Sequence, residues 1–128
     1  IKVLDPRGRD LDGHLSTFGD LRYDVAKLAH SVIGLYDYII GGFYNCMKVE
    51  DYSLNLNFPE NEMQTQLKEY FLSLKFAGYT TSELSVYPTM IHLFLSMLPL
   101  HSDRPDRQQA MLANALRLYA EYKNTNKL

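Results

Sequence analysis

The stretch DLRYDVAKLAHSVIGLYDYIIGG, residues 20–42, decides the fold. Its apolar side chains recur every three or four residues, which is the spacing of one face of a helix. Asp20 is a suitable N-cap, because its carboxylate can accept a hydrogen bond from an unpaired amide of the first turn. Gly41 and Gly42 can take the left-handed conformation that ends a helix. We therefore predict one long helix over residues 21–40.

The next segment, residues 44–58, changes to a period of two. Leu54, Leu56 and Phe58 alternate with asparagines, which is typical of a half-buried strand. A second alternating run precedes them, and Glu50 and Asp51 stand where a tight turn would join the two runs. These residues predict a β-hairpin.

Helical patterns return after the hairpin. Pro59 suits the first turn of one helix, and Gly78 closes that segment. Thr81 or Ser82 begins the next helix, which Pro88 kinks or restarts. This helix is apolar nearly all round as far as Pro99, so we expect it to be central and buried.

The last helix follows a polar loop. Asp103 can cap it, with Pro105 in its first turn, and NTNKL at residues 124–128 reads as a frayed polar end. Its predicted apolar face consists of Met111, Leu112, Ala115, Leu116, Leu118, Tyr119 and Tyr122. The fold class expected for residues 1–128 is a single domain, mainly α with a small β element (α+β).

Composition excludes several classes of protein. The 128 residues have a net charge of -2 and no basic stripe, so we expect no nucleic-acid partner. No apolar run approaches the ~20 residues that span a bilayer, so we expect no membrane association. Cys46 is the single cysteine and cannot form an intrachain disulfide. A cytoplasmic location is the expectation that follows.

The first eight residues, IKVLDPRG, carry the clearest chemical signal. Ile1 to Leu4 read as the end of a buried strand, and Asp5 follows directly. A carboxylate that projects past the end of a strand can bind Mg²⁺, which prefers oxygen ligands and substrate phosphates. Gly8 permits a sharp turn there, and Arg7 can pair with a phosphate oxygen or with a carboxylate.

Together, IKVLDPRG and GDLRYDVAKLAHSV (residues 19–32) resemble the aminoglycoside phosphotransferase and choline kinase-like family. More narrowly, they are similar to a branch found among capsule and surface-polysaccharide genes. The resemblance covers nearly the whole chain, but its sharp motifs lie in residues 1–33. It implies a C-terminal helical subdomain of a protein-kinase-like large lobe, which uses Mg²⁺ and ATP to phosphorylate a hydroxyl of a small molecule such as a sugar or an amino alcohol.

The resemblance also implies roles for individual residues. Asp5 takes the metal-ligand role, and Arg7 pairs with phosphate or with an acid. Asp20 and Asp24 match an acidic pair that supports the catalytic loop through hydrogen bonds. Acceptor specificity would come from the helical part, whose candidate wall residues are Tyr36, Tyr44, Tyr87, His92 and His101.

One part of the family pattern is missing. The catalytic loop, a His-Gly-Asp followed five residues later by Asn, lies before the Asp5 strand in the family, and this sequence contains neither that loop nor a nucleotide-binding lobe. We therefore expect a fragment of a larger phosphotransferase, inactive alone. A strand cut from its sheet would leave an open edge, so we also expect the isolated chain to self-associate.

Plainer interpretations stay open. Asp5 can cap a surface turn, because DPRG alone is a common turn sequence. Arg7 can pair with Asp20 or Asp24 instead of a phosphate. His92, on an apolar helix, is more often a hydrogen-bonded core histidine than a catalytic one. The alternative function is a non-catalytic helical binding or scaffold module.

Overall fold

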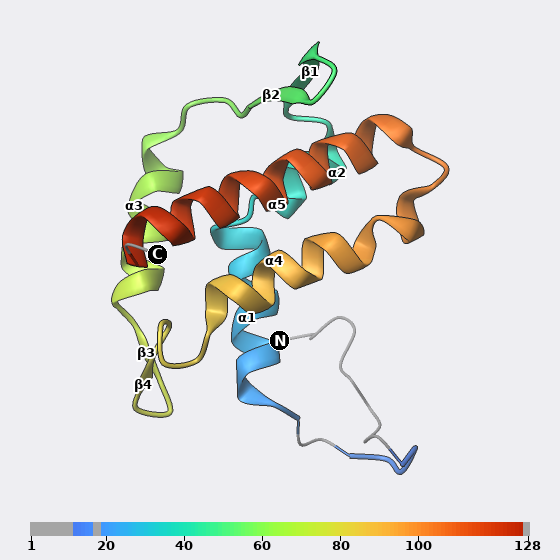
Figure 1. Cartoon of the computed structure of the whole chain (residues 1–128). Helices are drawn as coiled ribbons and strands as arrows, with labels where there is room; N and C mark the ends of the chain where they lie inside the picture. Colours follow the sequence, from blue (N-terminus) through green and yellow to red (C-terminus); the bar gives the residue numbers. More distant parts are fainter. Residues whose placement is uncertain (1–11, 17–18, 127–128) are drawn as a thin grey trace.

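A computed structural model describes residues 12–16 and 19–126, and it is mainly helical with two small antiparallel β-hairpins (Figure 1). The predicted α+β class is confirmed. The elements, in chain order, are α1 (Leu21–Val32), α2 (Tyr36–Gly41), β1 (Asn45–Glu50), β2 (Ser53–Asn57), α3 (Glu62–Ser73), β3 (Lys75–Phe76), β4 (Tyr79–Thr80), α4 (Val86–Met97), a short 3-10 helix (Pro99–His101) and α5 (Pro105–Asn126).

The predicted long helix is two helices. Asp20 caps α1 as expected, because its side chain accepts the Arg22 amide, and Gly42 ends α2 in the left-handed conformation with φ +77°. Continuity through residues 33–35 was predicted wrongly. A Cβ on Gly34 would lie 2.5 Å from Cε2 of Phe94, so α1 and α4 approach too closely there for any larger residue. Leu35 then takes φ +56°, which turns the chain into α2.

The predicted hairpin is confirmed, with its turn one residue later than expected. Strands β1 and β2 pair from Asn45 opposite Asn57 to Glu50 opposite Ser53, and the register shifts between Lys48 and Glu50. That shift inserts one extra residue into β1. The turn therefore falls on residues 51–52.

Two boundaries after the hairpin differ from the prediction. Helix α3 begins at Glu62 rather than near Pro59, because the Asn61 side chain accepts the Met63 amide at 3.0 Å and provides the cap. Gly78, with φ +88°, lies in the turn between β3 and β4, a small hairpin that was not predicted.

Helix α4 is central, as its apolar sequence predicts. It begins at Val86 rather than at Thr81 or Ser82, because residues 81–85 form turns. Pro88 lies in its first turn, where a proline costs no helical hydrogen bond. The helix packs against both α1 and α5. His92 is exposed on α4, so its interpretation as a core histidine is wrong.

Helix α5 starts at Pro105 as predicted, but the expected cap at Asp103 is wrong. The Arg104 carbonyl accepts the Gln108 amide at 3.0 Å, so Arg104 directly precedes the first turn. The helix continues to Asn126, which includes residues predicted to fray. Part of its predicted apolar face is exposed, namely Leu112, Leu116 and Tyr119.

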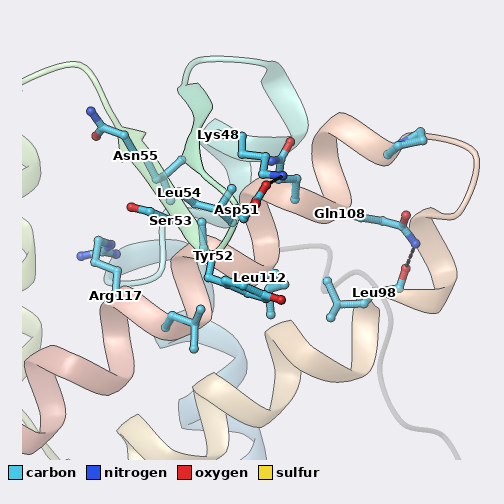
Figure 2. Close-up of a pocket in the computed structure, with 15 residues that line it drawn as sticks. Lys48, Asp51, Tyr52, Ser53, Leu54, Asn55, Leu98, Gln108, Leu112 and Arg117 are labelled. Atoms are coloured by element: carbon cyan, nitrogen blue, oxygen red, sulfur yellow. Dashed lines mark hydrogen bonds and ion pairs between the residues drawn. The ribbon is translucent and has the colours of Figure 1, made fainter.

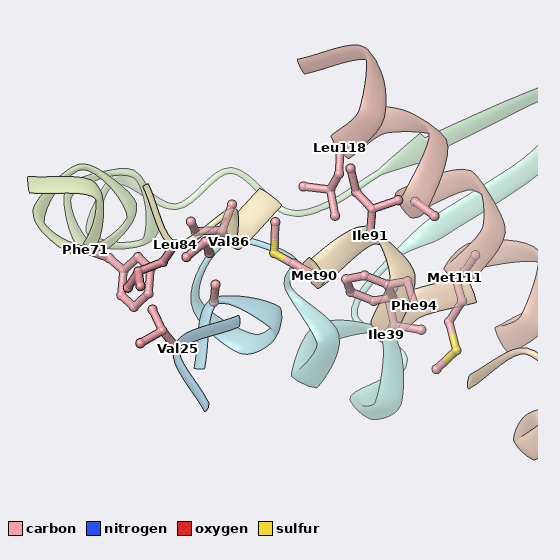
Figure 3. Close-up of a cluster of buried hydrophobic side chains, with 14 residues drawn as sticks. Val25, Ile39, Phe71, Leu84, Val86, Met90, Ile91, Phe94, Met111 and Leu118 are labelled. Atoms are coloured by element: carbon pink, nitrogen blue, oxygen red, sulfur yellow. The ribbon is translucent and has the colours of Figure 1, made fainter. Parts of the chain in front are cut away.

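The hydrophobic core lies between α1, α4 and α5 (Figure 3). It extends from Val25, Phe71 and Leu84 at one end to Phe94 and Met111 at the other. These side chains fix the three helices relative to one another, because each buried side chain contacts several neighbours. No helix in the described part of the chain has the length and apolarity to cross a bilayer.

Candidate functional site

The start of α1 carries the two predicted supporting aspartates. The Asp20 carboxylate accepts the backbone amide of Arg22 at 2.9 Å and its guanidinium at 2.6 to 3.1 Å. These hydrogen bonds hold the pKa of Asp20 below its usual value. Asp24 lies one turn further on, exposed, and its carboxylate accepts no side-chain hydrogen bond from the described residues.

Asp5 and Arg7 lie outside the described residues. The predicted magnesium ligand and its neighbouring cation therefore stay predictions. Among residues 12–16 and 19–126, no three His, Cys, Asp or Glu side chains gather closely enough to hold a metal ion.

Two of the predicted acceptor-wall tyrosines lie near the hairpin and α2. The ring of Tyr36 packs against the buried ring of His30, with centroids 4.5 Å apart. The hydroxyl of Tyr44 donates to Oδ2 of Asp106, at the start of α5, at 3.3 Å. Both tyrosines are half-buried, and burial raises the pKa of each hydroxyl.

The other three predicted wall residues lie elsewhere. Tyr87 is in the first turn of α4, His92 is exposed on the same helix, and His101 belongs to the 3-10 helix. Tyr87 lines a cavity of about 200 Å³ at the end of α5, and none of the five residues lines the much larger groove under the hairpin. The structure therefore does not assemble the predicted wall in one cavity of the described region.

A large hollow lies between the β1–β2 hairpin and α5, and we name it the hairpin groove (Figure 2). Its volume is about 1020 Å³. The exposed side chains of Leu112 and Leu116 and the fully exposed Tyr52 contribute apolar surface to it. Lys48, paired with Asp51 at 3.1 Å, contributes charge at the hairpin side. Its size is at the upper end of the range for small-molecule sites.

A polar network on the other flank of α5 was not predicted. Glu121 accepts Nζ of Lys68 from α3 and the hydroxyl of Tyr87 from α4, the latter at 2.9 Å. Arg117 lies one turn before Glu121, with 3.5 Å between NH1 and Oε2. Glu121 therefore joins three helices.

The network continues from Arg117 into the core. Nε of Arg117 donates to Oδ1 of Asn114 at 2.9 Å, and Nδ2 of Asn114 donates to the Gly34 carbonyl at 2.6 Å. Asn114 is fully buried. It therefore fixes the bend between α1 and α2 against α5, and it satisfies a carbonyl that the break in the helix leaves free.

Burial and pairing set the ionisation of this network. Burial opposes ionisation of Glu121, but the hydrogen bonds from Lys68 and Tyr87 outweigh it, so the pKa of Glu121 lies below its usual value. Burial and the bond to Glu121 raise the pKa of the Tyr87 hydroxyl. Burial lowers the pKa of Arg117, because Glu121 compensates its charge only in part. The network thus holds ionised groups in a partly buried place.

The sequence contains one feature that indicates this polar network. Asn114 interrupts the apolar face of the last helix, and a polar residue in such a face needs a partner when buried. The partners are 80 residues away at Gly34 and, for Glu121, 53 residues away at Lys68. No local pattern identifies them.

Comparison of the chain with protein-family models, with curated proteins and with solved structures found no match.

Proposed function

We propose that this chain is the C-terminal part of an ATP-dependent phosphotransferase that phosphorylates a hydroxyl of a small molecule. Within that enzyme Asp5 binds Mg²⁺, and the acidic start of α1 supports the catalytic loop. The acceptor is a sugar or an amino alcohol, and the pathway implied by the resemblance is surface-polysaccharide synthesis. The geometry of Asp24 carries the proposal.

Asp24 combines a fixed position with an available carboxylate. The same helix buries Val25 and Ala26, so the backbone beside Asp24 is held against the core. The Asp24 side chain is nevertheless exposed, in the first turn of α1. Phosphoryl transfer depends on positioning and charge neutralisation, and a carboxylate on a helix that is packed against the core can position a neighbouring loop by accepting its amides.

The hairpin groove supports the acceptor half of the proposal. Its polar and apolar lining suits a small hydroxylated molecule that also has apolar faces. Lys48 and Arg117 lie on this lining together with Ser53 and Asn55, so both charged and neutral hydrogen-bonding groups are present.

The test replaces Asp24 in the full-length protein that contains this chain. We expect Asp24→Asn to lower the rate of Mg²⁺-ATP-dependent phosphorylation while the thermal unfolding midpoint stays close to that of the wild type, because the exposed side chain packs against nothing in the core. Asp37→Asn, on the first turn of α2, is the matched control and should leave the rate unchanged. Equal rates for the Asp24→Asn and wild-type proteins would argue against the proposal.

A second candidate function is a non-catalytic helical binding module. The observation in its favour is the hairpin groove itself, since an open groove with exposed leucines can bind a partner without chemistry. A full-length protein that binds a small hydroxylated ligand in the groove, but transfers no phosphate to it, would favour this alternative.

A further inference from the structure

A smaller cavity, of about 200 Å³, lies where the end of α3, the start of α4 and the last turns of α5 meet. This cavity is separate from the hairpin groove, with which it shares no lining residue. Figure 1 shows the C-terminal end of α5 beside α3. We name it the Thr81 cavity, after a lining residue in the turns that precede α4.

Part of the wall of the Thr81 cavity is apolar. Leu72, Val86 and Pro88 contribute aliphatic surface to it. The rings of Tyr87 and Tyr122 also line the cavity, with planes inclined by 22° and centroids 6.2 Å apart. Because engineered protein cavities of about 150 Å³ bind benzene, a cavity of this size can hold one six-membered ring.

Thr81 gives the cavity a polar group without a partner. The residue is 8% exposed, and its hydroxyl makes no hydrogen bond within the part of the chain that the structure describes. Its oxygen keeps some accessible surface, in contrast to the enclosed unpartnered atoms of His30, Arg107 and Arg117. A buried hydroxyl without a partner in the fold usually meets a group that is not part of the chain.

The charge on the wall is already compensated. Glu121 is the one carboxylate that lines the cavity, and the described lining includes no Lys, Arg or His. Glu121 accepts Nζ of Lys68 and the hydroxyl of Tyr87, and NH1 of Arg117 lies 3.5 Å from its Oε2. An anion would therefore find no cation on the wall, and a cation would find the one carboxylate already paired. The wall favours an uncharged guest, because burying an uncompensated charge is costly.

The cavity has an accessible side. Ser82 and Ser85, which line it next to Thr81, are both exposed. A guest can enter past these two serines and reach the buried Thr81. Their hydroxyls make no hydrogen bond to another described side chain, so they add neutral donors and acceptors and no charge.

We propose that the Thr81 cavity binds a small uncharged molecule with one apolar ring and one hydroxyl group, of which phenol is the simplest example. The ring lies against the wall of Leu72, Val86 and the two tyrosines, and the hydroxyl shares a hydrogen bond with Thr81. The volume sets the size of the ring, the pairing of Glu121 excludes a charge, and Thr81 requires the hydroxyl. This proposal does not depend on the phosphotransferase proposal.

The experiment follows the methyl groups of the full-length protein that contains this chain by NMR while phenol is added up to about 10 mM. We expect saturable binding with a Kd of about 1 mM, which suits a ligand of about seven non-hydrogen atoms. The methyl groups of Leu72, Thr81 and Val86 should shift most. Absence of a saturable shift there, or larger shifts at Leu112 and Leu116 of the hairpin groove, would overturn the proposal.

A thermodynamic cycle tests the hydrogen bond to Thr81. Thr81→Val keeps the shape of the side chain but removes its hydroxyl, so it should weaken phenol binding about fivefold. Toluene has the shape of phenol without the hydroxyl, and its affinity should be equal in the two proteins. The thermal unfolding midpoint should not fall, because the hydroxyl has no partner in the described fold. Unchanged phenol affinity in Thr81→Val, or equal losses for phenol and toluene, would overturn the proposal.

Two further comparisons test the specificity of the cavity. Thr65→Val, at an exposed position of α3 outside the cavity, is the matched control and should leave the phenol affinity unchanged. Benzoate and benzylammonium should bind at least about tenfold more weakly than phenol, since the wall offers neither ion an unpaired opposite charge. Binding of either ion as tight as that of phenol, or equal losses in the two threonine variants, would overturn the proposal.

Discussion

The hydrophobic cluster between α1, α4 and α5 and the polar network around Glu121, which joins α3, α4 and α5, hold helices together by different means. In the cluster, Phe94, Met90 and Met111 are fully buried and need only complementary shape. In the network, Glu121 must be met by specific atoms of Lys68, Tyr87 and Arg117. The comparison teaches that the hydrophobic cluster tolerates replacement by apolar side chains of similar size. The polar network tolerates few replacements, because its hydrogen bonds require particular donor and acceptor atoms.

The largest effect is expected in the hydrophobic cluster. Phe94→Ala should lower the free energy of unfolding by about 3–5 kcal/mol, since it removes a fully buried ring that also contacts Gly34 and His30. Urea denaturation measures the loss. Met90→Leu is the control for shape and should cost less than about 1.5 kcal/mol. A small loss for Phe94→Ala would mean that the cluster does not set the stability.

The polar network should respond to chemistry rather than to size. Asn114→Leu keeps the branching of the side chain at Cγ, although leucine is larger, and removes the bonds to Gly34 and Arg117, so we expect a loss of about 1–3 kcal/mol. The same urea titration measures it. If Asn114→Leu costs no more than Met90→Leu, the distinction between the two regions fails.

His30 is the polar exception inside the apolar region. It is buried between the rings of Tyr36 and Phe94, and burial, assisted by the charge of Lys27 and opposed by that of Asp37, lowers its pKa from 6.5 to about 4. As the pH falls, His30 is therefore protonated in the unfolded chain at a higher pH than in the folded chain. Stability should be full above pH 6.5, decline below it and level off below pH 4, with a loss of about 2 kcal/mol from His30 between pH 7 and pH 5.

Unfolding titrations at several pH values measure this decline. In the His30→Gln protein, the free energy of unfolding should depend less on pH between pH 7 and pH 5. In the His92→Gln protein, which changes the exposed histidine of α4, the dependence on pH should stay as in the wild type. Equal slopes in the two variants would contradict the assignment to His30.

Much of the hydrophobic region could be predicted from the sequence, because each of its helices has a periodic pattern of apolar residues. The recurring apolar residues of α1, α4 and α5 and the alternation of the hairpin required only neighbours within a few positions. The break after α1 was not predicted from local periodicity: Leu35 takes a left-handed conformation there, and Gly34 lies against the ring of Phe94, 60 residues later. The short β3–β4 hairpin pairs two residues on each side, too few for a pattern.

The candidate site was less predictable for the same reason. Asp20 as a cap follows from local chemistry, and the structure agrees. The hairpin groove and the Glu121 network depend on contacts between distant segments, and a single sequence does not indicate which surfaces of two helices meet. The five predicted wall residues share an aromatic or titratable side chain, and that similarity did not imply a shared location.

The proposed phosphotransferase activity depends above all on Asp5 as the magnesium ligand. The most direct measurement is phosphate transfer from ATP by the full-length protein during a Mg²⁺ titration, with wild-type and Asp5→Asn proteins side by side and Asp37→Asn as control. We predict a turnover about a hundredfold lower for Asp5→Asn and a higher Mg²⁺ requirement, with Asp37→Asn unchanged. Wild-type turnover in the Asp5→Asn protein at every Mg²⁺ concentration would contradict the account.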